Sequence, residues 1–153
     1  MKKKKIEPQF IYKGLGFPIL LKNVPMVDIR GVKTPDINLN LLQIAVLLAL
    51  AFSPVALTGN QVRYIRLWLE LNQTEFGALL GVTHPAVVKW EKTKNEASKI
   101  TLTTQRDLKA LLLDKLLDRD EDFRTAFRKI HLSKISNKIE PLEFDAQKDL
   151  VAG

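Results

Sequence analysis

The segment THPAVVKWEK, residues 83–92, combines hydrogen-bond donors with methyl groups at the spacing of one helix face. Lys89 could donate to O6 or N7 of guanine, and His84 could donate to a base or to a phosphate. Val88 or Ala86 could touch a thymine methyl group. The candidate base-facing residues are Thr83, at the mouth of the helix, His84, Pro85, which offers only shape, Val88 and Lys89. This chemistry is recognition of DNA through the edges of its base pairs.

Further cations lie at the end of this segment and after it, and they suit the neighbouring phosphates. They are Lys92, Lys94 and Lys99, with Asn95 among them. A single lysine is equally well explained as a solvated surface charge. As a cluster beside the candidate helix, the lysines favour contact with the DNA backbone.

Composition narrows the alternatives. The 153 residues contain no cysteine and two histidines, so neither a thiolate zinc site nor a cysteine nucleophile is available, and we expect no metal or cofactor. We find no glycine-rich phosphate loop and no Ser-His-Asp arrangement, and we read the acidic run at 118–122 as a helix start rather than a cation site. A net charge of +7 favours an anionic partner. We therefore do not expect an enzyme, and we expect a cytoplasmic protein.

The elements that must position these residues are two short helices joined by a tight turn between Gln73 and Lys92. In this helix-turn-helix pattern, Gly77 is small where the helices cross, and Gly81 ends the first helix with a positive φ. Val87 and Trp90 face the core. An ordinary helical hairpin is the alternative, but these spacings together favour the helix-turn-helix.

Both helices carry capping signals. Asn72, with Glu75 three residues later, forms a variant of the capping box. Thr83 precedes the second helix, and Pro85 lies in its first turn, where a missing N–H is harmless.

Helical patterns surround this motif. They cover Gly59–Leu71, which opens with a Thr58/Gln61 capping box, then Arg106–Leu117, whose helix begins near Thr101–Thr104, and Asp120–Leu132. Most of the leucine stripe in Arg106–Leu117 is expected to close the core, and the remainder could contact a second subunit.

The N-terminal part is expected to be different. Glycine and proline separate three predicted strands, Gln9–Lys13, Phe17–Val24 and Met26–Arg30. Leu39–Phe52 follows as a helix that is apolar nearly all round, so it must be buried on every side, either within the chain or against a second copy. Its unbroken apolar run is too short to span a bilayer. The basic start, residues 1–5, is a solubilising end or an arm for phosphates.

The stretch from Thr58 to about Leu117 resembles the phage-repressor, Cro-like (XRE) helix-turn-helix family. The residues that carry the resemblance are Gln73, Phe76, Gly77, Leu80, Gly81, Val82, Val87, Trp90 and Glu91. The resemblance implies that Gln73 contacts a phosphate and that the protein binds DNA as a dimer. The family usually has a glycine one or two residues after its Trp-Glu pair, and WEKTKNE has none.

The N-terminal pattern of Tyr12, Gly14, a strand and then Asn23-Val24-Pro25 is similar to the zinc ribbon of one helix-turn-helix antitoxin family, without its cysteines. In those relatives, the N-terminal module holds a toxin and the DNA-binding dimer represses the operon.

We therefore expect a mainly α (α+β) fold with three parts. They are a strand-plus-helix module at 1–57 for partner binding or dimerisation, a five-helix Cro/repressor-like domain at 58–132, and a C-terminal tail at 133–153. The expected function is a homodimeric repressor that binds operator DNA, and specifically an autoregulating antitoxin with a toxin partner. The alternatives are a prophage-type repressor and a protein-interaction module. No membrane association is expected.

Overall fold

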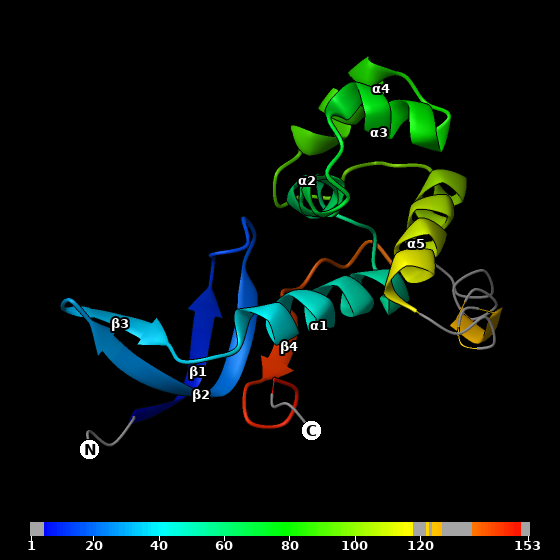
Figure 1. Ribbon diagram of the computed structural model, residues 1–153. Coiled ribbons are helices and arrows are strands. Elements are labelled where there is room, and N and C mark those ends of the chain that lie inside the picture. Colours follow the sequence, from blue (N-terminus) through cyan, green and yellow to red (C-terminus); the bar gives the residue numbers. More distant parts are fainter. Residues whose placement is uncertain (1–4, 118–121, 123, 127–135, 151–153) are drawn as a thin grey trace. The chain divides into compact units, whose positions relative to one another are not determined.

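The computed structural model describes residues 5–117, 122, 124–126 and 136–150, which form an α+β fold (Figure 1). Two compact units are present: Met1–Val46 with Pro141–Gly153, and Leu47–Glu140. The strands are β1 (Lys5–Tyr12), β2 (Ile19–Ile29), β3 (Val32–Pro35) and β4 (Leu142–Asp145). The helices with assigned bounds are α1 (Leu39–Phe52), α2 (Gly59–Trp68), α3 (Gln73–Leu80), α4 (His84–Glu91) and α5 (Leu102–Leu116).

Strand β2 is the centre of the sheet in the first unit. It pairs antiparallel with β1 along most of its length, and antiparallel with β3 over Met26–Ile29. Strand β4 pairs parallel with Ile19–Lys22 of β2. The edge of β2 that does not face β1 is therefore shared between β3 and β4.

The predicted strands Phe17–Val24 and Met26–Arg30 are one strand, so the prediction of two is wrong. The prediction ended a strand at Pro25, but Pro25 lies within β2, opposite Ile6 of β1. The strand also has a local irregularity at Asn23, whose φ of 51° lies in the left-handed region. Buried positions shift there from odd residues, Ile19 and Leu21, to even ones, Val24 and Met26. The alternation of buried residues breaks at this point although the strand continues.

The C-terminal segment is not a loose tail. Residues 142–145 form β4, and Phe144, Ala146 and Leu150 are buried. The Asp145 carboxylate accepts hydrogen bonds from Asn23 Nδ2 at 2.8 Å and from the backbone of Gln147 at 2.9 Å. The Asn23 hydrogen bond is the main reason why the pKa of this carboxyl lies below its usual value. The segment joins the N-terminal sheet, so the predicted tail at 133–153 is corrected over these residues.

Helix α1 has the predicted bounds, but one side of it is exposed. Its buried residues follow a helical spacing and are Leu42, Val46, Leu47, Leu50 and Ala51. Leu39 and Ile44 remain exposed. The predicted boundary after residue 57 also differs from the structure, whose two units divide between Val46 and Leu47 within this helix. Among the described residues, no helix is long and apolar enough to cross a bilayer.

The second unit contains α2 to α5. Helix α2 ends at Trp68, three residues earlier than predicted, because Glu70 adopts a positive φ of 59° and Leu71 N–H donates back to the Arg66 carbonyl. Thr101 caps α5. Lys109 of α5 is buried and donates to the Ser53 carbonyl just beyond α1, and burial lowers its pKa from 10.5 to about 8. The predicted helix Asp120–Leu132 lies outside the described residues except for 122 and 124–126, which are helical.

Candidate nucleic-acid interface

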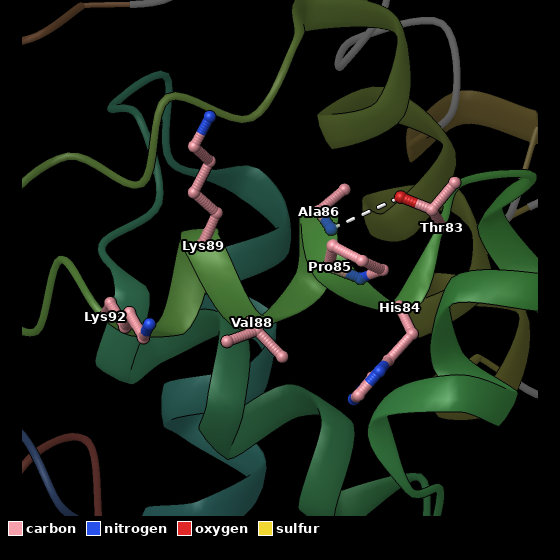
Figure 2. A pocket seen from close by; sticks show the side chains of 7 residues that line it. All are labelled: Thr83, His84, Pro85, Ala86, Val88, Lys89 and Lys92. Atoms are coloured by element: carbon pink, nitrogen blue, oxygen red, sulfur yellow. Dashed lines mark hydrogen bonds between the residues drawn. The ribbon is translucent and has the colours of Figure 1, made fainter.

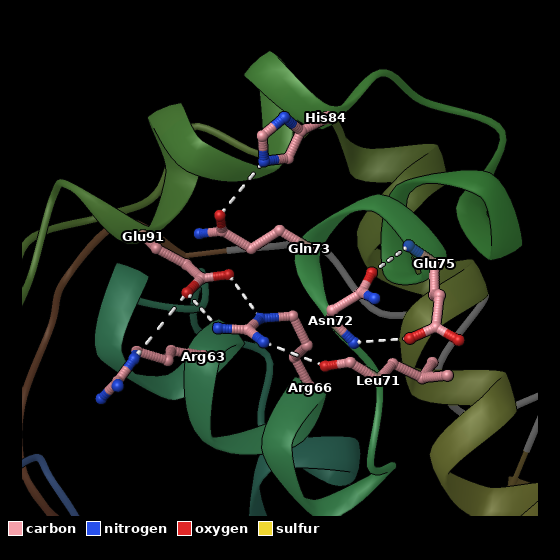
Figure 3. Close-up of polar contacts among 8 residues, drawn as sticks. All are labelled: Arg63, Arg66, Leu71, Asn72, Gln73, Glu75, His84 and Glu91. Atoms are coloured by element: carbon pink, nitrogen blue, oxygen red, sulfur yellow. Dashed lines mark hydrogen bonds and ion pairs between the residues drawn. The ribbon is translucent and has the colours of Figure 1, made fainter.

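The predicted pair of helices and the turn between them are confirmed. Helix α3 begins after Asn72, whose Oδ1 accepts a hydrogen bond from Glu75 N–H at 2.8 Å. Glu75 returns the contact, since its carboxylate accepts from Asn72 N–H at 3.0 Å (Figure 3). The helix ends at Gly81, where φ is +70°, so this position favours glycine. Three residues, 81–83, separate the two helices.

Helix α4 begins as its sequence predicts. Thr83 is the cap residue, and its hydroxyl oxygen accepts from Ala86 N–H at 3.3 Å (Figure 2). Pro85 occupies the first turn. On the opposite side of the helix, Val87 and Trp90 are buried. One face of α4 is thereby fixed in the core and the other is left for solvent or a ligand.

Two glycines allow close approach of the backbone. A Cβ on Gly77 would lie 3.0 Å from the Val82 carbonyl oxygen, so the atoms nearest to this glycine belong to the turn rather than to the second helix. A Cβ on Gly59 would collide with the Trp90 carbonyl oxygen at the end of α4 and lie 2.5 Å from Thr93 Oγ1. Sequence reasoning found the first glycine but missed the second.

A nearly buried ion pair joins α2 to the end of α4, and sequence reasoning missed it. The guanidinium of Arg66 donates to both oxygens of the Glu91 carboxylate, at 2.8 and 2.9 Å (Figure 3). The same guanidinium donates to the Leu71 carbonyl at 2.9 Å. The two side chains are only 10% and 8% exposed. Arg66 stands among the apolar residues Val62, Ile65 and Leu69, which was the one sequence signal for burial.

The loop after α4 takes a left-handed turn without glycine. Lys94 has a φ of 55°, and its carbonyl accepts from Asn60 N–H at 2.8 Å. Asn95 Oδ1 accepts from Asn60 Nδ2 at 3.0 Å. A lysine, three residues after Glu91, therefore occupies a left-handed conformation that suits glycine.

Most predicted contact residues form one surface. An open depression of about 610 Å³ is lined by Thr83, His84, Pro85, Ala86, Val88, Lys89 and Lys92 (Figure 2). Gln73 joins it indirectly, because its Oε1 lies 3.2 Å from His84 Nε2 (Figure 3). Lys94 does not line the depression and lies in the following loop.

The charge on this surface is positive. Lys89 and Lys92 are exposed, and no acidic residue lines the depression. The nearby carboxylate of Glu91 is neutralised by Arg66, and Arg63 Nε lies 3.9 Å from it. The two lysine charges are therefore left to attract an anion.

No group of three or more His, Asp or Glu side chains in the described part of the chain could hold a metal ion. Comparison with protein-family models, with curated proteins and with solved structures finds no match to this chain.

Proposed function

We propose that this protein is a sequence-specific DNA-binding transcriptional regulator whose helix α4 enters the major groove. The observation that supports it most is the lining of one open, cationic surface by six of the eight predicted contact residues. A helix with its N-terminal residues at the base edges, held by a second helix behind it, is the way in which helix-turn-helix proteins dock. We include in this proposal that the second unit has a Cro-like fold.

The residues predicted to contact phosphates fit the DNA backbone in this arrangement. Gln73 is the first residue of α3, where a helix N-terminus favours a phosphate. Its Oε1 lies near His84, which leaves the amide NH₂ to donate to phosphate. Lys92 and Lys94 follow α4 and would contact the flanking backbone.

The regulator is proposed to act as a homodimeric repressor on two half-sites about one helical turn apart. The resemblance of the N-terminal pattern to an antitoxin module supports an autoregulating antitoxin with a toxin partner. A prophage-type repressor is the alternative on the same DNA-binding surface. A toxin-sized reading frame beside the gene would favour the first role, and a phage integrase would favour the second.

The experiment is a gel-shift titration of the intact protein on the DNA upstream of its own gene. We expect a discrete shift that weakens steeply as salt rises. If Lys89 reads a base, Lys89→Ala should weaken specific binding by about 1–3 kcal/mol. If Lys89 contacts a phosphate, the same variant should weaken binding equally on all DNA sequences. Lys115→Ala, which removes an exposed charge on α5, is the matched control. No shift at low salt would contradict the proposal.

A protein-interaction module is the second candidate, and one observation favours it. The turn between β2 and β3 is made by Arg30 and Gly31, both with positive φ, and it presents the paired side chains Ile29 and Val32. They are 53% and 63% exposed. An apolar pair at an exposed hairpin tip suits a protein partner. Normal DNA binding by the Ile29→Ser/Val32→Ser variant, together with loss of its binding to a co-expressed toxin, would show that this hairpin tip binds the partner.

A further inference from the structure

Several hydrogen-bonding groups at the start of α4 are already used within the protein. Thr83 Oγ1 serves as the helix cap for Ala86 N–H. His84 Nε2 faces Gln73 Oε1 at 3.2 Å. Pro85 has neither a backbone N–H nor a polar side chain. The first turn therefore has few free hydrogen-bonding groups with which to distinguish one base pair from another.

The first two turns of α4 also expose an apolar patch. Pro85 and Val88 are three residues apart and share one helix face, with Ala86 beside them in the lining of the same depression (Figure 2). Pro85 is exposed, whereas Ala86 and Val88 are half-buried. Lys89 and Lys92 border this apolar patch and bring it toward an anionic surface.

The major groove offers one apolar group to such a patch. Among the base edges it exposes, only thymine carries a methyl group, at C5, and the other groups are hydrogen-bond donors or acceptors. A donor or acceptor placed against Pro85, Ala86 and Val88 would lose its water without gaining a partner, which disfavours those bases.

We propose that α4 selects its DNA site through thymine C5-methyl groups, which pack on the apolar patch of Pro85, Ala86 and Val88. This inference rests on the proposed function and specifies the class of operator. Each half-site contains thymine opposite the first two turns of α4. Sites that place guanine or cytosine edges against the patch bind more weakly.

The test begins with selection of duplexes from a random pool by the intact protein, followed by replacement of each selected thymine with deoxyuridine. Deoxyuridine keeps every hydrogen-bonding group and removes only the methyl. Loss of one packed methyl should weaken binding about fourfold at one or two positions in each half-site, and have little effect elsewhere.

Variants link the effect to the patch. Val88→Ala is expected to fold, since alanine favours a helix. It should bind the thymine site more weakly than wild type and respond less to deoxyuridine. Leu79→Ala, an exposed apolar residue of α3 outside the depression, should keep the full deoxyuridine effect.

The outcomes separate two failures. Tight, selective binding that changes by less than about twofold at every deoxyuridine position would overturn the methyl inference and leave the DNA-binding proposal intact. A deoxyuridine effect that Val88→Ala and Pro85→Ala leave unchanged would also overturn it, because another surface would then read the methyl. Failure to enrich any duplex at low salt would overturn both.

Discussion

The ion pair between Arg66 and Glu91 should hold the end of α4 in place. Glu91 is the last residue of α4, where the negative end of the helix dipole disfavours an anion. Its carboxylate is nearly buried, so Arg66 must compensate its charge. Removing one partner of such a buried pair destabilises a protein by about 3–5 kcal/mol, because the other charge is left without a partner.

Arg66→Met tests this magnitude, because methionine retains the apolar stem and removes three hydrogen bonds. We expect urea unfolding at pH 7 to show a loss of about 3 kcal/mol or more. Arg63→Met is the matched control: its side chain is 59% exposed and its Nε lies 3.9 Å from Glu91, so the expected loss is under about 1 kcal/mol.

A double variant separates the interaction between the two side chains from the contribution of each side chain alone. Arg66→Met/Glu91→Leu should recover part of the stability lost by Arg66→Met, because no uncompensated charge then remains. The proposed role of this ion pair is refuted if Arg66→Met is no more destabilising than Arg63→Met. It is also refuted if the stability lost by the double variant equals the sum of the losses of Arg66→Met and Glu91→Leu.

Three further predictions concern stability, each measured by urea or thermal unfolding. Gly59→Ala should destabilise the protein by about 1–3 kcal/mol or more, because its Cβ meets the Trp90 carbonyl oxygen. Gly77→Ala, whose nearest carbonyl oxygen is at 3.0 Å, should change stability by under about 1 kcal/mol. Equal losses in the two variants would contradict this difference. Lys94→Gly should stabilise by up to about 1 kcal/mol by relieving the positive φ, whereas Lys94→Ala should not; a loss in both would show that the lysine side chain matters instead. The pKa of Lys109 is lower in the folded protein than in the unfolded chain, so the free energy of unfolding should rise by about 3 kcal/mol as pH increases from 8 to 10.5. Lys109→Met should remove this rise. An unchanged rise in the variant would exclude Lys109 as its source.

Local signals in the sequence predicted the local structure of the candidate interface. Asn72, Gly81 and Thr83 act through backbone atoms within a few residues, so their roles are visible in a linear pattern. The bounds of α1 were predicted for the same reason, because the apolar run Leu39–Phe52 is a local pattern. Six of the eight contact residues lie together since they belong to one helix and its cap.

Long-range relationships were not predictable. Strand β4 pairs with residues more than 120 positions earlier, and nothing in LEFD specifies that partner. Proline usually marks a strand end, but Pro25 lies inside β2, so one strand was predicted as two. The burial of Arg66 was not predicted, because the compensating carboxylate of Glu91 is 25 residues away. Each of these features depends on contacts that the tertiary fold creates.

Chemical protection of DNA tests the central claim most directly. Dimethyl sulfate methylates guanine at N7, which lies in the major groove, and adenine at N3, which lies in the minor groove. We expect the bound protein to protect the N7 of guanines placed next to the thymine positions of each half-site, and to leave adenine N3 reactive there. Protection of adenine N3 alone, or of neither atom in a saturated complex, would contradict entry of α4 into the major groove.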